Sequence, residues 1–212
     1  MRITHPTTLA TLLLAVGMLA SAGPGKAADE TAPAFDCGRA FGDVEEMICG
    51  DPALAALDRR ITRRFANAVR SLRQGEDAKA AVKALRAEQR GWISGRNECW
   101  KAEDMRSCTE DAYLTREGEL TATYLLESPV ATASYACNDN PADAFDAAFF
   151  ETALPSVRVE RGDSIATGSL APSASGSRYA LPFGRELWIK GEEATLVWPE
   201  GEQNTCRRIA GG

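Results

Sequence analysis

Six cysteines constrain this chain more than any other feature of its sequence. They stand at Cys37, Cys49, Cys99, Cys108, Cys137 and Cys206. Six is many for a cytosolic protein of 212 residues but ordinary for an exported one. Their spacing is not that of the paired C-x-x-C knuckles that hold zinc. We therefore expect disulfide bonds that cross-link small units with limited cores.

The first 27 residues are typical of an export signal. Arg2 supplies a positive charge, and Leu9 to Ala22 is an uncharged apolar run that ends in a small-x-small pattern. The run is too short to span a membrane comfortably. We expect cleavage near Ala22 or Ala27 and a periplasmic or secreted product without stable membrane insertion. Since no cysteine lies near either position, a lipid-modified cysteine is not expected.

The histidine and charge content exclude several function classes. The one histidine, His5, lies in the expected signal peptide. A mature chain without histidine cannot use Ser–His or Cys–His catalysis or a His-ligated metal, and we expect no metal and no cofactor. From Ala28 onward, 24 basic residues less Arg2 and Lys26 leave 22 against 30 acidic ones, a net charge of −8. This balance disfavours nucleic acid and favours a basic partner.

Helical periodicity extends over residues 36–127. Asp51 and Pro52 form an N-cap followed by proline at the first helical position. Gly75 is a plausible C-cap, and Ser107 with Glu110 forms a possible capping box for a third helix. We expect a three-helix unit. The apolar positions that predict its faces are Leu54, Leu57, Ile61, Phe65, Ala68 and Leu72, then Val82, Leu85, Trp92 and Ile93, then Tyr113, Leu120 and Tyr124.

The four cysteines of this half allow three pairings. Antiparallel helices at roughly 54–73 and 79–97 would bring the start of the first near the end of the second. That arrangement places Cys49 beside Cys99 and leaves Cys37 for Cys108. We therefore favour this nested pairing, whose role would be to stabilise a small core.

The second half has the pattern of an antiparallel sheet. Residues 128–133 form a short linker of small residues, and from Ser134 to Gly212 short β-rich runs alternate with turn residues. The runs are SYAC, FDAAFF, VRVE, SIATG, SRYAL, ELWIK, ATLVW and TCRRI. They predict a sandwich or small barrel, with Cys137 on the first run bonded to Cys206 on the last. The fold class is thus α+β with two domains, 36–127 and 134–212.

The helical half resembles the LprI-type lysozyme-inhibitor family. The resemblance rests on the order and spacing of many positions across residues 36–126. They are Cys37, Glu46, Ile48, Cys49, Asp51, Pro52, Leu54, Leu57, Asp58, Gln89, Arg90, Trp92, Arg96, Cys99, Cys108, Tyr113 and Leu120.

The second half is similar to the MliC/PliC inhibitors of C-type lysozyme. The strongest signal is S-G-x-x-Y at Ser175, Gly176 and Tyr179, followed by W-x-K-G-x-x-A-x-L from Trp188 to Leu196. One spacing departs from the family pattern: the stretch from Tyr179 to Trp188 is one residue longer. It contains Pro182 and Gly184, which predicts a different loop shape near Lys190.

The second resemblance implies an inhibitor of C-type lysozyme rather than an enzyme. In such a protein Lys190 and Ser175 would enter the active site, the lysine between two catalytic carboxylates and the serine as a hydrogen-bond donor. Gly176 and Gly191 would let the two loops turn tightly. Tyr179 completes the expected inhibitory loop set, although a core position would suit it equally. Arg178 and Trp188 could flank the insertion.

Two other function classes remain open. Ser175 and Lys190 could form a Ser–Lys nucleophile pair, although no S-x-x-K motif includes either residue. Alternatively, the chain is a cell-envelope binding or scaffold module without lysozyme inhibition, mainly through its helical half. The polar and aromatic residues there that could form a ligand site or a buried network are Glu46, Asp58, Gln89, Arg90, Trp92 and Arg96.

Overall fold

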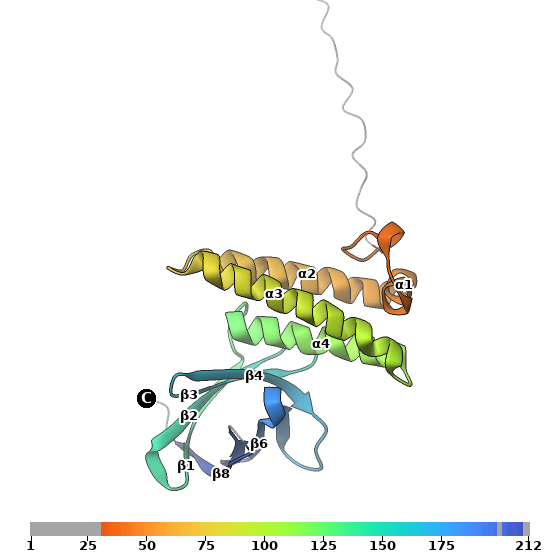
Figure 1. Ribbon diagram of the computed structural model, residues 1–212. Coiled ribbons are helices and arrows are strands. Elements are labelled where there is room, and N and C mark those ends of the chain that lie inside the picture. Colours follow the sequence, from red (N-terminus) through yellow and green to blue (C-terminus); the bar gives the residue numbers. More distant parts are fainter. Residues whose placement is uncertain (1–30, 199–200, 210–212) are drawn as a thin grey trace, which may run out of the picture. The chain divides into compact units, whose positions relative to one another are not determined.

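A computed structural model describes residues 31–198 and 201–209 (Figure 1). The expected signal peptide lies outside the described residues. In those residues four α-helices precede eight strands, which makes a two-part α+β fold. The helices are α1 (Asp43–Gly50), α2 (Pro52–Leu72), α3 (Ala78–Asn97) and α4 (Met105–Tyr124), with 3-10 turns at Cys37–Arg39 and Glu98–Lys101. The expected three-helix unit was therefore wrong by one short helix, α1.

The helix ends show which capping signals operate. Asp51 caps α2, and its carboxylate accepts the backbone N–H groups of Ala53 at 2.8 Å and Leu54 at 3.2 Å, as predicted. The capping box at Ser107 was wrong, because α4 is capped by Asp104, which accepts the N–H of Ser107 at 2.9 Å. An aspartate three residues earlier thus supplies the acceptor that the helix start requires. The C-cap expected at Gly75 was wrong, because α2 ends at Leu72 and Arg73 is its C-cap.

The apolar faces of the helices meet in one core. The fully buried side chains there include Ile48, Leu54, Leu85, Tyr113 and Leu120. Most of them lie at the helical spacing seen in the sequence, so periodicity identified the inner faces. Within the described residues, no helix combines the length and apolar content that a membrane span needs.

The disulfides of the helical half are local, not nested. Cys37 bonds to Cys49 with the Cα atoms 5.9 Å apart, and Cys99 bonds to Cys108 with the Cα atoms 5.6 Å apart. The nested prediction, Cys37–Cys108 and Cys49–Cys99, was wrong. Helix α1 packs against the Cys37–Arg39 turn, which brings Cys49 near Cys37. The Glu98–Lys101 turn is followed closely by α4 and contacts it, which brings Cys108 near Cys99. The bonded cysteines are therefore only 12 residues apart in the first disulfide and 9 residues apart in the second.

The second half is a closed antiparallel barrel in which each strand pairs with its neighbours in sequence and β1 pairs with β8. Every predicted run contributes a strand. β1 starts at Ala131, inside the segment expected to be a linker. The strands are β1 (Ala131–Cys137), β2 (Asn140–Phe150), β3 (Ser156–Arg161), β4 (Ser164–Ala171), β5 (Ser177–Ala180), β6 (Glu186–Lys190), β7 (Glu193–Val197) and β8 (Gln203–Ile209).

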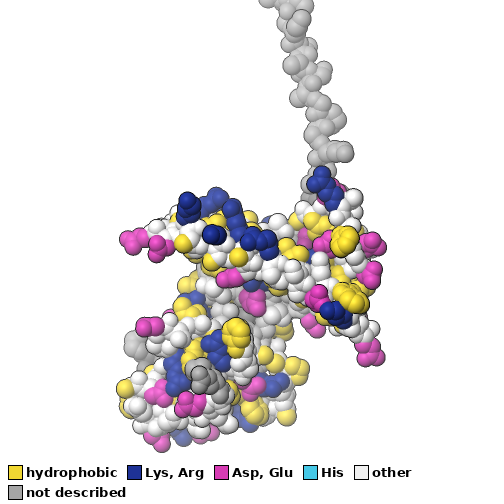
Figure 2. All heavy atoms as spheres, viewed as in Figure 1, with side chains coloured by type: hydrophobic (Ala, Val, Ile, Leu, Met, Phe, Trp, Pro, Cys, Tyr) yellow, Lys and Arg dark blue, Asp and Glu magenta, His cyan; other side chains and the backbone are white. Residues whose placement is uncertain are grey.

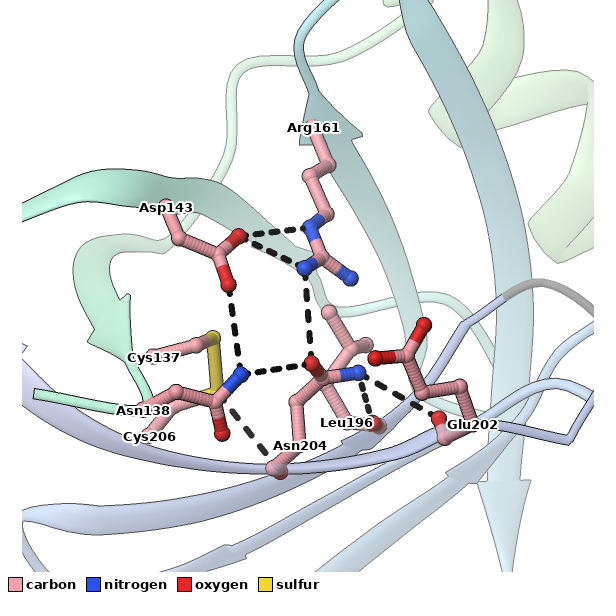
Figure 3. The surroundings of a disulfide bond; sticks show 8 residues. All are labelled: Cys137, Asn138, Asp143, Arg161, Leu196, Glu202, Asn204 and Cys206. Carbon is pink, nitrogen blue, oxygen red and sulfur yellow. Dashed lines mark hydrogen bonds and ion pairs between the residues drawn. A yellow bond between two sulfur atoms is a disulfide. The ribbon is translucent and has the colours of Figure 1, made fainter. Parts of the chain in front are cut away.

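The seam between β1 and β8 is closed covalently. Cys137 and Cys206 pair across the two strands and form the predicted disulfide (Figure 3). Beside it the amide of Asn204, 1% exposed, donates to the Leu196 carbonyl at 3.2 Å and accepts from Asn138 at 2.9 Å. Both the nitrogen and the oxygen of this buried amide therefore have hydrogen-bond partners, which offsets the free-energy cost of burying them.

Helix α4 contacts α2 and α3 as well as strands β3 and β4 (Figure 1). Its contact with the barrel is close at Gly118, where an added Cβ would lie 2.8 Å from the Cβ of Ser156. The guanidinium of Arg158 also donates to the carbonyl of Thr123 at 2.9 Å, and the Thr123 and Thr167 hydroxyls lie 3.2 Å apart. The end of α4 and the barrel wall thus share direct packing and hydrogen bonds.

Candidate functional site

The barrel brings the expected inhibitory residues to one end of a strand pair. Ser175 and Gly176 lie in the connection before β5, whereas Lys190 is the last residue of β6. β5 and β6 are antiparallel, and Ser177 pairs with Ile189. The connection that holds Ser175 therefore lies beside the β6–β7 turn, which begins at Gly191 with φ of 63°.

Gly176 sets how closely these two segments approach. Its φ is +68°, and a Cβ added there would lie 2.1 Å from the carbonyl oxygen of Ile189 and 3.0 Å from Cγ of Lys190. A side chain at this position would collide with backbone that cannot move independently of the sheet. Glycine is thus required twice, for its positive φ and for the contact with the Lys190 segment.

Trp188 connects the two sides of the site. Its indole Nε1–H donates to the carbonyl oxygen of Ser175 at 2.8 Å. The Nζ atom of Lys190 lies 3.6 Å from the centroid of the Trp188 ring, a cation–π contact. Because residues two apart on a strand face the same side, the W-x-K spacing could have indicated this stacking from the sequence.

Lys190 and Ser175 are both exposed. Among the described residues no carboxylate lies within ion-pair distance of the Lys190 ammonium, and no hydrogen bond joins it to the Ser175 hydroxyl. The pair therefore lacks the direct contact that a Ser–Lys nucleophile pair uses. What the arrangement offers instead is a cation with three N–H donors next to a hydroxyl, both available to a partner.

Tyr179 lies in the core, apart from this exposed set. Its side chain is 7% exposed, and its ring centroid lies 5.7 Å from that of Phe149. Burial raises the pKa of the Tyr179 phenol. Arg178 lies nearer the loop, where it donates to the Pro172 carbonyl at 3.0 Å and pairs with Glu186 at 3.1 Å.

The long spacing before Trp188 is accommodated away from Lys190. Phe183 and Gly184, in a short 3-10 turn, have φ of 61° and 71°. This turn joins Ala180 to Glu186, which pair at the other end of the β5–β6 hairpin from the Lys190 end. The extra length thus shapes the opposite loop, and its Phe183 ring is 95% exposed.

In the helical half, three of the six residues noted from the sequence form a buried network. The Tyr113 hydroxyl donates to the Asp58 carboxylate at 2.8 Å and accepts from the Arg96 guanidinium at 2.7 Å. The Cζ atom of Arg96 also lies 5.5 Å from the centroid of the Trp92 ring. Burial raises the pKa of Tyr113, which keeps the phenol protonated and donating. Gln89 instead accepts from Arg116 at 3.1 Å. Glu46 and Arg90 are exposed.

Comparison with known proteins agrees with both resemblances. Residues 135–205 match the family described as membrane-bound lysozyme-inhibitor of c-type lysozyme, and residues 37–103 match the family described as lysozyme inhibitor LprI. Over 204 residues the chain is 26% identical to proteins named Lipoprotein LprI from Mycobacterium bovis and Mycobacterium tuberculosis. The alignment covers 92% of this chain and 96% of each relative.

Both family descriptions name inhibitors rather than enzymes. They match the two structural parts in chain order, the helices first and the barrel second. The chain therefore carries a segment that matches the lysozyme inhibitor LprI family at residues 37–103, followed by a segment that matches the MliC lysozyme-inhibitor family at residues 135–205.

Proposed function

We propose that this protein inhibits C-type lysozyme by inserting Lys190 between the two catalytic carboxylates while Ser175 donates a hydrogen bond to one of them. The observation that carries the proposal is the double contact of Trp188. One indole holds the Ser175 backbone through its N–H and lies under the Lys190 ammonium. The two donors are thereby ordered before any partner arrives, which lowers the entropic cost of binding.

The chemistry of the target suits this pair. A retaining glycosidase places its two carboxyl groups about 5–5.5 Å apart. A lysine ammonium between them can replace the substrate and pair with both, because it is a compact charge with three donors. Removing water from such a pair strengthens the attraction, provided that both carboxylates find donors. The Ser175 hydroxyl would supply one more donor.

Charge supports the choice of partner. The whole chain has a formal net charge of −6. C-type lysozymes are typically basic, so opposite net charges would steer the two proteins together and raise the association rate. The local cation, Lys190, would then meet the two catalytic carboxylates in the cleft of the target.

The place of action would be the cell envelope or the exterior. Three disulfides are consistent with an oxidising compartment. The mycobacterial relatives are named lipoproteins, and the matched barrel family is described as membrane-bound. These names support association with the cell envelope, and the export-type residues 1–27 are consistent with a periplasmic or secreted protein. Within the chain, we assign inhibition to the unit 134–212 and a separate role to 36–127.

The test is inhibition of cell-wall lysis by the full mature chain. It should inhibit a C-type lysozyme and spare G-type and I-type enzymes. Lys190→Ala should weaken inhibition by roughly 2–5 kcal/mol, mostly through faster dissociation, because it leaves buried carboxylates unpaired. Ser175→Ala should cost about 1–3 kcal/mol. Lys83→Ala, which removes an exposed lysine on α3, is the matched control.

Two results would decide against the proposal. A folded Lys190→Ala protein that inhibits as well as the parent would contradict charge insertion. A parent protein that inhibits none of the three lysozyme types would favour the envelope-binding module considered from the sequence.

A further inference from the structure

Two large aromatic side chains are exposed side by side at one end of the helical part. Phe41 is 88% exposed and Trp100 is 58% exposed. Both line one cavity of about 350 Å³, together with Val44 and Asn97. Exposed apolar groups of this size that gather in one place cost free energy in water and mark interaction sites more often than scattered ones do.

The segments that bear these rings are held firmly. Phe41 lies inside the loop closed by Cys37–Cys49, and Trp100 lies inside the loop closed by Cys99–Cys108. The local disulfides therefore fix the backbone on both sides of the cavity. A surface held in this way loses little conformational entropy when a partner binds.

A hydrogen-bond chain adds to this support. The backbone N–H of Phe41 donates to Glu45 at 2.9 Å. The other oxygen of that carboxylate accepts from Asn97 at 3.2 Å and lies 3.6 Å from the buried guanidinium of Arg96. The Phe41 loop is thus tied to the buried Arg96–Tyr113–Asp58 network, and its ring is exposed on a supported backbone.

Acidic side chains surround the two rings. Asp43 and Glu98 line the same cavity. Residues 36–51 contain five acidic residues and one basic residue, and residues 98–104 contain three and one. The basic members, Arg39 and Lys101, pair with Asp36 and Glu98, so the surplus charge is negative. Figure 2 shows magenta carboxylates around yellow side chains over the end at which α1 lies.

We propose that Phe41 and Trp100, framed by Asp43 and Glu98, form a second docking surface for a cationic protein, and that this protein is C-type lysozyme. The identity of the partner rests on the proposed function, whereas the surface does not. Aromatic anchors would insert into an apolar part of the basic partner while the carboxylates meet its lysines and arginines, the usual division between the centre and the rim of an interface. Because Lys190 would already occupy the lysozyme cleft, this second contact would lie outside it.

The experiment separates this surface from the barrel site. Hen lysozyme whose cleft is filled with a chitotriose oligosaccharide is titrated calorimetrically into the Lys190→Ala protein. We expect measurable binding, weakened about tenfold or more by Phe41→Ser with Trp100→Ser. Raising the salt from about 0.05 M to about 0.5 M should also weaken it, because the rim is charged. Circular dichroism confirms the fold of each variant.

Matched controls make the result specific. Phe183→Ser removes an aromatic ring that is 95% exposed on the barrel and should leave the affinity within about twofold. Asp43→Lys with Glu98→Lys should weaken binding, whereas Glu76→Lys, in the turn between α2 and α3, should not.

Three outcomes would overturn the inference. The first is that cleft-filled lysozyme does not bind the Lys190→Ala protein. The second is that replacing Phe41 and Trp100 leaves its affinity unchanged. The third is that the free oligosaccharide itself binds in a way that depends on these two rings. Lysis assays with the parent and Lys190→Ala test the proposed function separately. A failure there leaves the calorimetric result interpretable on its own.

Discussion

The ammonium group of Lys190 lies 3.6 Å from the centroid of the Trp188 ring, and the same indole donates its N–H to the carbonyl of Ser175. The tryptophan therefore acts as a positioning residue for both. Its influence on the site has two separable parts, the ring face under the lysine and the single N–H donor. Substitutions that keep one part and remove the other can measure each.

Trp188→Phe should weaken lysozyme inhibition modestly. Phenylalanine keeps an aromatic face for Lys190 but has no N–H for the Ser175 carbonyl, a loss of about 0.5–1.5 kcal/mol. Trp188→Ala should cost about 0.5–1 kcal/mol more, because the cation–π contact is also lost. Inhibition constants from lysis assays give both numbers. Equal inhibition by all three proteins, at equal melting temperature, would exclude a positioning role.

Gly176→Ala should impair inhibition by forcing the two loops apart. The new methyl group would need to occupy space 2.1 Å from the Ile189 carbonyl oxygen, and the residue also has φ of +68°. Gly162→Ala is the control, because Gly162 has a comparable φ of +57° but nothing within 4 Å of its Cβ position. Both should lose about 1–2 kcal/mol of stability from positive φ. We expect reduced inhibition from Gly176→Ala alone, and similar inhibition by the two variants would contradict the close-approach argument.

The exposed site could be predicted only in part from the sequence. The family motif singled out Ser175 and Lys190, which the structure brings to the same end of the β5–β6 pair. The W-x-K spacing could also have placed Trp188 on the face of Lys190. The hydrogen bond from Trp188 could not be foreseen, because its acceptor is a backbone carbonyl in an irregular connection. Tyr179 shows the opposite case: its motif position suggested the loop, whereas its place in β5 directs the ring into the core.

The fold was more predictable for the barrel than for the helices. Short β-rich runs separated by turn residues identified all eight strands. The helix α1 was missed because it has only eight residues and Gly42 at its N-cap makes no side-chain capping bond. That omission also produced the wrong cysteine pairing, since the reversal at α1 brings Cys37 to Cys49. Short helices between cysteines leave little periodic signal.

The disulfides that close the longest and the shortest loop should differ in their contribution to stability. Cys137–Cys206 closes a loop of 69 residues, whereas Cys99–Cys108 closes one of 9. Chain entropy predicts a loss of about 4 kcal/mol for the long loop and about 2.5–3 kcal/mol for the short one when both cysteines are replaced by serine. Urea unfolding of the two double variants measures the difference. A larger loss from the short loop would show that native packing, not chain entropy, dominates.

Gly118→Leu should disturb the contact between α4 and the barrel. The larger side chain would overlap Ser156, whose Cβ would lie 2.8 Å from even a methyl group there, and overpacking costs about 1–3 kcal/mol. Gly91→Ala is the control: it lies in α3 with open space around its Cβ position and should gain up to about 1 kcal/mol. Thermal unfolding of the two variants tests this. If the Gly118→Leu protein unfolds at the same temperature as the parent protein, the contact between α4 and the barrel contributes no stability.

The N-cap Asp51 should make the stability of the helical part depend on acid pH. Burial alone would raise its pKa, but hydrogen bonds from Leu54, Arg106 and Ala53 lower it below the ordinary 3.8. The folded state thus favours the carboxylate, so its contribution to stability is complete above pH 3.8 and is lost as the pH falls through the lower pKa of the folded state.

Asp51→Ala should therefore cost about 0.5–2 kcal/mol at neutral pH and less near pH 2. Asp51→Asn keeps the cap without the charge and should show a smaller loss. Urea unfolding at both pH values measures these differences in the free energy of unfolding. If the difference between the parent and Asp51→Ala is as large near pH 2 as at neutral pH, the ionised cap is not its cause.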